Sequence, residues 1–473
     1  MELSKFIIMR DELSLVVVLL LLLIFEVFSK KSNRHMMIGV AIGLFSMHTL
    51  LGFMTPTFGT LFGDMYHNTG TTSLMKNVLN LGVLVVLLQS SGWLRKPENN
   101  NRVTEFFMLI FSTLIGMYYM ISAGDFLMFY LGLELATIPM ATLVAYEVHK
   151  IKSTEGGIKL LLLAALSSGV LLFGISMIYG STGSVYYADV ADLMNMNTLQ
   201  ILALVFFISG VAFKISLVPF HLWTADTYEG APTPVAAYLS VVSKGASVFV
   251  LIMLLFKVFP NMEEAWHIMM IITAVLTMTI GNLFALRQTN IQRFLAFSSV
   301  AQAGFILLGV IAGTKYGMTT VIYFVLVYVF SNLAAFGVVN AVRNATGKMT
   351  ITDYDGFYDT NPKLALIMVL ALFSLAGIPP VAGFFGKFFL FAAAAEQGYY
   401  ILVIIAVLNT IISLYYYLIV IKSMFINKTD TPIETINTDM FGKVGLIIST
   451  VGMIVIGIWA YVFNWVDAVS FGM

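Results

Sequence analysis

Three lysines lie inside long apolar stretches of the chain, where a charged side chain is unfavourable. Lys214, Lys244 and Lys387 each sit too far from the ends of their stretch to reach water easily. A lysine at the depth of a bilayer costs about 3 kcal/mol even on the lenient insertion scale. We therefore expect these residues to serve a function. The chemistry that suits a lysine whose charge is disfavoured is the uptake and release of a proton.

One carboxylate, Glu134, is the only acidic group deep in a predicted membrane span, and Pro139 lies just beyond it. A nearby negative charge favours the protonated form of a lysine, whereas burial favours the neutral form. Moving Glu134 toward or away from Lys214 would therefore switch that lysine between holding and releasing its proton. The alternative is a structural ion pair or a folding anchor.

Polar residues beside the lysines could extend a proton relay. His221 titrates near neutral pH and could pass protons on, although it could equally be a satisfied histidine at the interface. Ser240 and Ser247 lie four residues before and three residues after Lys244. At helical spacing they share its face and could hold water there. The alternative for Lys244 is a structural bond to a backbone carbonyl.

The composition is that of a polytopic membrane protein. The 473 residues are 59% hydrophobic and 11% charged, and the mean hydropathy is +0.92, values far from those of a soluble domain. The net charge is zero, so nothing suggests a nucleic-acid partner. The chain has no cysteine, which excludes disulfides, iron–sulfur ligation and thiolate metal sites. The six histidines are scattered, so neither a metal nor another cofactor is predicted in this chain.

Fourteen membrane spans are predicted, because each crossing needs about 20 apolar residues. The predicted spans are 13–28, 36–57, 73–93, 104–122, 125–147, 156–180, 199–229, 230–257, 265–286, 294–312, 318–342, 363–396, 400–425 and 443–466. The seventh is broken by Pro219 and the twelfth by Pro379 and Pro380, since proline interrupts a helix. Lys76 and Lys159 lie near span ends, where a long side chain can reach the interface.

The layout of these spans predicts an all-α fold with an inverted repeat. The two broken helices are five spans apart, so the second copy is upside down, as in many transporters. We expect a three-helix segment at 1–103, five-span repeats at 104–257 and 258–425, and a C-terminal helix at 426–473. Sixteen Lys and Arg residues lie in or next to the loops after odd-numbered spans, against four at the N-terminus and the other loops, and five lysines lie within spans. The positive-inside rule then predicts both termini on the outer side.

Four motifs resemble a known family. They are Val218-Pro-Phe-His-Leu-Trp223 with Tyr228-Glu-Gly-Ala-Pro-Thr-Pro234, Glu134 between two leucines, Arg293-Phe-Leu-Ala-Phe-Ser-Ser299, and Ala376-Gly-Ile-Pro-Pro380 leading to Lys387. They are similar to the antiporter-like membrane subunits of respiratory complex I, and most of all to the branch called subunit N. A lysine rather than a glutamate at position 387 argues against branch M, and the length of the chain argues against branch L.

This resemblance implies a proton-translocating subunit of a bacterial-type NADH:quinone oxidoreductase, multi-pass in the inner membrane and without a redox centre of its own. Glu134 and Lys214 would be the coupling pair, Lys244 the central relay and Lys387 the residue toward the outer exit. NADH, FMN, iron–sulfur clusters and quinone are then expected in partner subunits. The expected neighbours are the antiporter-like subunit M and small subunits such as J and K, besides membrane lipid.

One position departs from the family pattern. Family members commonly have a histidine where this chain has Gln302, and glutamine cannot carry a proton at neutral pH, although it can order water.

Two other functions are weighed against the proton pump. A subunit of a multi-subunit cation/proton antiporter would share the fold and the charged positions, but the sequence motif at 228–234 favours complex I. A passive scaffold would have no use for three buried lysines and two broken helices.

Overall fold

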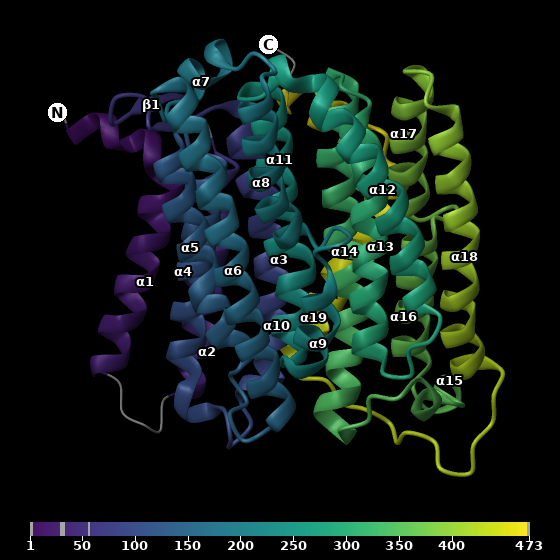
Figure 1. The fold of residues 1–473 in the computed structure, drawn as a ribbon. Coiled ribbons are helices and arrows are strands. Elements are labelled where there is room, and N and C mark those ends of the chain that lie inside the picture. The colour runs from purple at the N-terminus through teal and green to yellow at the C-terminus, as the bar shows by residue number, and fades with distance from the viewer. Residues whose placement is uncertain (1–2, 29–33, 55–56, 471–473) are drawn as a thin grey trace.

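The computed structural model describes residues 3–28, 34–54 and 57–470, and this part of the chain is almost entirely helical. Long helices run side by side between the two ends of the molecule, and both ends of the chain lie at the same end (Figure 1). Twelve helices among the described residues are long and apolar enough to cross a membrane. The predicted all-α polytopic fold is therefore confirmed.

The N-terminal segment is a three-helix unit with a small hairpin. Its elements are η1 (Leu3–Met9), α1 (Arg10–Phe28), α2 (Arg34–Gly52), β1 (Gly59–Leu61), β2 (Tyr66–Asn68) and α3 (Gly70–Leu94). The two strands pair antiparallel, with Thr60 opposite His67. No hairpin was predicted, because two strands of three residues leave no alternating pattern long enough to read.

The next group of helices contains the first predicted break. In order, it comprises η3 (Asn100–Arg102), α4 (Val103–Ile121), α5 (Phe126–Val144), α6 (Ile151–Thr182), α7 (Tyr187–Leu193), α8 (Thr198–Ile215), α9 (Leu222–Gly230), α10 (Thr233–Tyr238), the π-helical turn η4 (Leu239–Ser243) and α11 (Lys244–Lys257). Pro219 lies between α8 and α9, as predicted. The π turn in the following span was not predicted.

The remaining helices contain the second break. They are η5 (Pro260–Met262), α12 (Glu263–Ala285), α13 (Ile291–Ile311), α14 (Lys315–Thr346), η6 (Ile351–Tyr354), α15 (Phe357–Thr360), α16 (Pro362–Ala376), α17 (Ala382–Glu396), α18 (Tyr400–Phe425), α19 (Met440–Ile458) and α20 (Tyr461–Ser470). Pro379 and Pro380 lie between α16 and α17, as predicted. The inversion of one half relative to the other stays a prediction.

Local chemistry at the helix ends explains several boundaries. The Asp125 carboxylate accepts a hydrogen bond from Met128 N (2.8 Å) at the start of α5, and Asn290 caps α13 in the same way. Such side chains satisfy backbone N–H groups that have no partner inside the helix. The two longest helices, α6 and α14, end at glycines with left-handed backbone, Gly183 (φ 73°) and Gly347 (φ 75°).

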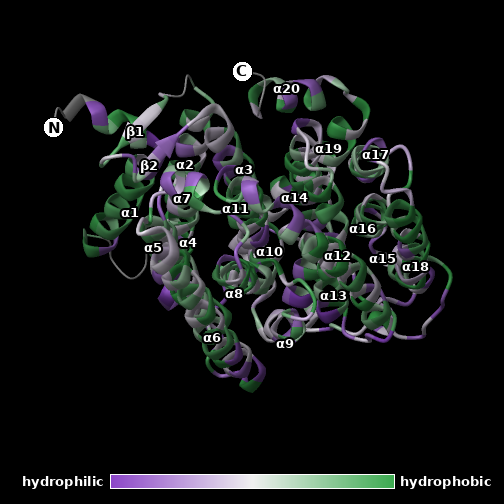
Figure 2. Cartoon of the chain, turned by 45° about the horizontal axis from the view of Figure 1, so that its top comes forward, coloured by the Kyte–Doolittle hydropathy of each residue, from purple (hydrophilic) through white to green (hydrophobic). Residues whose placement is uncertain are grey.

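The core lies around α13 and α14, whose apolar windows are completely buried. Helix α14 contacts α3, α13, α16, α17 and α19. By contrast, α6 and α18 expose apolar side chains such as Leu162, Leu166 and Ile401. Figure 2 shows these outer helices largely green, with a hydrophilic end on α6. Apolar surface on the outside and polar groups within is the pattern of a helix bundle that faces lipid.

Candidate functional site

Lys214 lies in the last turn of α8, immediately before the first break. Its ammonium donates a hydrogen bond to Thr137 Oγ1 on α5, one turn beyond Glu134. None of the ion pairs within 4.0 Å in the described part of the chain joins Lys214 to Glu134. Lys214 and Glu134 therefore come from two helices, α8 and α5, that are joined here by the bond to Thr137. Sequence analysis missed Thr137, although its spacing from Glu134 puts both on one helical face.

Lys244 is the first residue of α11 and follows the π turn. Its Nζ donates to Ser299 Oγ (2.9 Å) and to the Ser299 carbonyl oxygen (3.2 Å) on α13. The side chain is buried, and its Nζ lies 5.9 Å from the centre of the Tyr228 ring. Lys244 therefore makes the carbonyl bond considered as its alternative role, together with a hydroxyl bond. The Ser299 hydroxyl was not singled out from the sequence.

The two serines expected beside Lys244 make other bonds. Ser240 donates to the Ala237 carbonyl (2.9 Å) and accepts from Asn332 (2.7 Å). Ser247 donates to the Ser243 carbonyl (2.9 Å). The expectation assumed regular α-helical spacing. The π turn at Leu239–Ser243 widens the helix just before the lysine, and such turns are frequent at functional sites.

Lys387 lies in α17, just past the second break. Its Nζ donates to the Ala376 carbonyl oxygen (3.2 Å) and lies 4.4 Å from the centre of the Phe305 ring. Gln302 binds the neighbouring carbonyl, that of Leu375, through its Nε2 (2.8 Å). Both carbonyls belong to the last turn of α16. The broken helix therefore supplies free backbone acceptors to the lysine and to the glutamine side by side.

Helix α13 connects the two lysine sites. Ser299, which holds Lys244, is one turn before Gln302 on the same helical face. Gln302 also approaches Tyr417 OH of α18 (3.3 Å), which in turn bonds Ser298 (2.6 Å). One fully buried helix thus carries polar groups from the centre of the molecule to the second break.

Several buried polar atoms near these sites have no well-formed hydrogen bond. Among the described residues they include Glu134 Oε1, Ser216 Oγ, both ring nitrogens of His221, Thr224 Oγ1, Tyr228 OH, Gln302 Oε1, Tyr328 OH and Asn332 Oδ1. The hydroxyls of Tyr228 and Tyr328 lie beside Ser299, and the Pro219 backbone lies beside His221. Leaving such a group unsatisfied costs about 1–3 kcal/mol, and ordered water is the usual remedy.

A charged cavity of about 800 Å³ lies at the end of the molecule opposite both chain ends. Glu147 in its lining accepts from Arg343 (3.1 Å), Lys150 (2.9 Å) and Trp93 Nε1 (3.1 Å). Burial opposes ionisation of this carboxyl, but Arg343 and these other partners outweigh it and hold the pKa of Glu147 below its usual value. Arg343 also donates to Thr233 Oγ1 (3.1 Å) at the start of α10, so the cavity adjoins the helix that leads to Lys244.

The two remaining span lysines differ from each other. Lys159 is 40% exposed and pairs with Asp226 (2.7 Å) and Glu155 (2.6 Å), as suits the end of a span. Lys76, which was also expected to reach the interface, is instead fully buried and pairs with Glu12 at 2.6 Å. The expectation was wrong because Glu12 belongs to α1, which begins earlier than the predicted span. Glu134, which is itself half-buried, is therefore not the only acidic residue inside a long helix, since Glu12 is fully buried in α1.

The two broken helices and the lysines inside the bundle define a membrane protein of the antiporter-like class. Comparison with known proteins then identifies the family. The family described as "NADH:quinone oxidoreductase/Mrp antiporter, TM" matches residues 123–413. In fold, the chain resembles a subunit of respiratory complex I from Thermus thermophilus (TM-score 0.80, 26% identity, 96% of this chain and 98% of that one). It also resembles the Mrp complex from Dietzia sp. (TM-score 0.84, 19% identity, covering 99% and 97%).

Two relatives narrow the assignment. NADH-quinone oxidoreductase subunit N of Phocaeicola vulgatus is 50% identical over 98% of both chains. Subunit N of Azobacteroides pseudotrichonymphae is 48% identical over 100% of this chain and 99% of its own. The chain belongs to the NADH-quinone oxidoreductase subunit N family.

Proposed function

We propose that this chain carries protons across the membrane as subunit N of a proton-translocating NADH:quinone oxidoreductase. The observation that carries the proposal is the set of lysines inside the helix bundle, with Lys244 and Lys387 buried and Lys214 half-buried, and with nearby polar atoms that lack a well-formed hydrogen bond. Water at those atoms would complete a path for protons. The chemistry of this chain is then proton transfer alone, driven by quinone reduction elsewhere in the complex.

The contacts of the lysines favour proton transfer over a structural role. Lys244 and Lys387 bond only hydroxyl and carbonyl oxygens, according to the contacts in the described part of the chain. A lysine without a carboxylate partner in a dry environment gives up its proton more readily than an ion-paired one. Glu134, one turn from the hydroxyl that holds Lys214, is placed to change the charge at that end of the line.

The direction of transport follows from the two ends of the path. We propose intake through the cavity at Glu147 and Arg343, which lies on the lysine-rich side that sequence analysis assigns to the cytoplasm. Both termini then face the outside of a bacterial inner membrane. NADH, FMN, iron–sulfur clusters and quinone would be bound by partner subunits. Subunit M and the small subunits J and K are the proposed neighbours.

The proposal is tested by removing the central charge in the intact complex. Lys244→Met keeps the length of the side chain but cannot carry a proton. In complex reconstituted into liposomes, we expect NADH-driven acidification to fall at least tenfold. Lys428→Met, at an exposed loop lysine, is the matched control and should pump normally. Normal pumping by Lys244→Met would show that this lysine is no relay.

The second candidate is a subunit of a cation/proton antiporter, which the fold of the Mrp complex also suits. The identity to subunit N chains favours the oxidoreductase. Purification of the chain from its membrane separates the two. Peripheral iron–sulfur subunits should accompany an oxidoreductase subunit, whereas an antiporter subunit would bring only other membrane subunits.

A further inference from the structure

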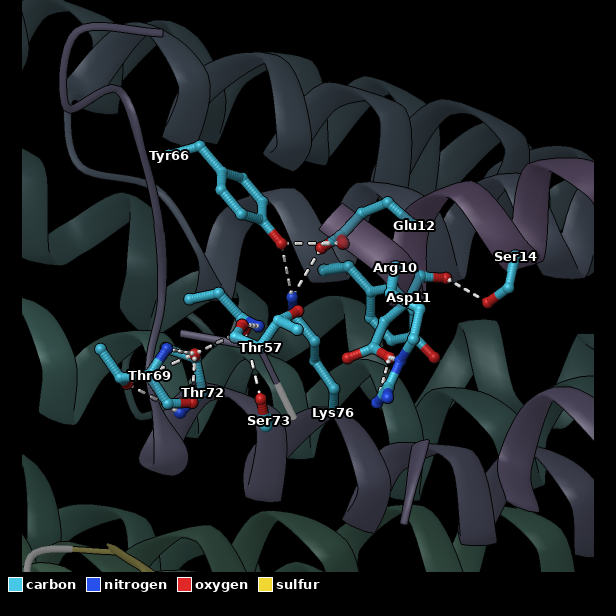
Figure 3. A network of polar contacts seen from close by, with 12 residues as sticks. Arg10, Asp11, Glu12, Ser14, Thr57, Tyr66, Thr69, Thr72, Ser73 and Lys76 are labelled. Atoms are coloured by element: carbon cyan, nitrogen blue, oxygen red, sulfur yellow. Dashed lines mark hydrogen bonds and ion pairs between the residues drawn. The ribbon is translucent and has the colours of Figure 1, made fainter. Parts of the chain in front are cut away.

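A second group of buried ionisable side chains lies in the N-terminal segment, apart from the relay lysines (Figure 3). Lys76 Nζ donates to Glu12 Oε1 (2.6 Å) and to Tyr66 OH (3.0 Å), and Tyr66 OH donates to Glu12 Oε2 (2.8 Å). The three side chains come from α3, α1 and β2, and each is at most 1% exposed. Three hydrogen bonds therefore close a ring that solvent does not reach directly.

We propose that this Glu12–Tyr66–Lys76 triad is a second protonatable site, through which protons pass from the central helix to a cavity on the outer side. The inference rests on the proposed function of the chain, and it adds an outlet separate from Lys387. No residue of the triad was singled out as a relay group from the sequence.

The hydrogen bonds of the triad permit a balanced proton transfer. Tyr66 gives its hydroxyl proton to Glu12 and takes one from Lys76 in the same movement, so the ion pair becomes a neutral acid and a neutral amine while the phenol is unchanged. Glu12 then releases its proton to water on the outer side, and Lys76 takes up another from the inner side. One proton passes in each cycle, and no electrons move.

On the outer side the triad adjoins a cavity of about 510 Å³. Thr72, one turn before Lys76 on α3, belongs to its lining. Ser122, whose hydroxyl lies beside Tyr66, has no well-formed hydrogen bond, and neither has the hydroxyl of Tyr187 in the cavity lining. The cavity also touches the end of α11, the helix that begins at Lys244, and it lies at the end of the molecule where both chain ends are found (Figure 1).

On the inner side, polar groups continue from the triad toward the central helix. Asn80, one turn after Lys76, accepts a hydrogen bond from Tyr118 OH, and its own Nδ2 has no partner. His48 bonds the same tyrosine (3.0 Å). On the same α4 helix, Thr113 bonds Tyr238 OH at 2.8 Å, and Tyr238 precedes Lys244 by six residues. Helix α3 itself packs against α10, η4 and α11.

A purely structural ion pair is the alternative, since a buried pair can simply anchor α1 to α3. Besides the triad, the charged or titratable groups nearby are Asp11, Arg10, His48, Tyr118 and Tyr119. Breaking a buried pair by removing one partner is strongly destabilising, because the other charge is left buried and unpaired. Single charge deletions therefore cannot separate an anchor from a relay, and the test needs variants that leave the pair intact or remove both charges.

Two variants meet this need in the reconstituted complex. Tyr66→Phe keeps the direct bond between Lys76 and Glu12 but removes the hydroxyl through which the proposed transfer runs. Glu12→Gln combined with Lys76→Met removes both charges at little change in volume. We expect each to assemble and to reduce NADH-driven acidification about tenfold at the same rate of electron transfer. Glu26→Gln, an exposed carboxylate at the other end of α1, is the control and should pump normally.

Infrared difference spectra distinguish a relay from a structural anchor, because only a relay changes its protonation during turnover. During turnover, the carboxylic acid formed at Glu12 should add a C=O stretching band that is missing when Glu12→Gln is combined with Lys76→Met. Normal pumping by both variants, or a spectrum without that band, would overturn the inference. If Lys244→Met also pumps normally, the proposed function fails as well; if only Lys244→Met stops the pump, the triad alone is excluded.

Discussion

Two kinds of partner distinguish the buried lysines of this protein. Lys214, Lys244 and Lys387 donate to hydroxyl and carbonyl oxygens, whereas Lys76 donates to a carboxylate. A carboxylate stabilises the charged lysine, whereas neutral oxygens stabilise it much less. At the scale of single residues, the two proposed proton sites therefore differ in the partner of the lysine, which is a neutral oxygen in one and a carboxylate in the other.

Gln302 offers a direct test of a group that orders the path without titrating. Gln302→Leu keeps the bulk but removes the amide that donates to the Leu375 carbonyl and to Tyr417. We expect proton transport to slow about tenfold, since the proposed path loses the free acceptor Gln302 Oε1 near Lys387. Gln302→His restores a polar ring nitrogen and should retain transport. Acidification of liposomes measures both variants, with Gln397→Leu at an exposed site as the control.

The cluster at Glu147 predicts a dependence of stability on pH. The lowered pKa of this carboxyl means that its contribution is present above the unfolded value of about 4.3 and is lost as the pH falls through the folded value. At neutral pH, Glu147→Gln should be less stable by about 2 kcal/mol, because charged hydrogen bonds to Arg343 and Lys150 become neutral. Thermal unfolding of the detergent-solubilised chain at stepped pH measures the difference. A gap that does not begin to shrink as the pH falls below about 4.3 would contradict this prediction.

At the scale of elements, irregular turns place the functional groups. The break between α16 and α17 frees the Leu375 and Ala376 carbonyls for Gln302 and Lys387, and the π turn precedes Lys244. Regular helices would have used those backbone acceptors internally. The straight helix α13 then carries Ser299 and Gln302 past both sites.

Helices α16 and α17 meet so closely that one methyl group should disturb them. A Cβ at Gly383 would lie 1.7 Å from the Ser374 carbonyl oxygen, which is backbone and cannot turn aside. Gly383→Ala should therefore destabilise the protein by about 1–3 kcal/mol and impair pumping, because Lys387 is one turn away. Gly180→Ala in α6 meets nothing within 4 Å and is the matched control. Melting temperatures in detergent compare the two, and equal values would show that the contact can relax.

At the scale of the whole molecule, α14 holds the N-terminal segment to the second half of the chain. Gln89 of α3 donates to the Leu333 carbonyl on α14 (3.0 Å), and Asn340 of α14 donates back to the Gln89 carbonyl (2.7 Å). Gln89 also lies 3.5 Å from Ser449 on α19. A few polar contacts therefore tie together helices that are otherwise joined by apolar packing, where hydrogen bonds specify register.

Removal of this link should loosen the N-terminal segment. Gln89→Leu keeps the packing volume but loses the side-chain bonds to Leu333 and Ser449, while the backbone carbonyl at position 89 still accepts from Asn340; we expect a loss of about 1–2 kcal/mol. Gln288→Leu, in the loop after α12, removes an amide that donates to the Phe284 carbonyl near the end of that helix, so it should change little. Thermal unfolding in detergent compares them. A smaller loss for Gln89→Leu than for Gln288→Leu would count against the link.

The sequence by itself determined the apolar spans, the positions of Lys214, Lys244 and Lys387 in them, and the two breaks at proline. These features depend on hydropathy and on the chemistry of neighbouring residues, which act over a turn or two. The domain boundaries and the outward orientation of the termini are predictions of the same local kind.

The tertiary structure alone decided what each buried charge touches. Ser299 is 55 residues from Lys244, and Glu12 is 64 residues from Lys76. Such partners meet only when separate helices pack, and the π turn at Leu239–Ser243 was likewise not predicted. Contacts across helices depend on the packing of the whole bundle, and a local sequence pattern does not predict that packing.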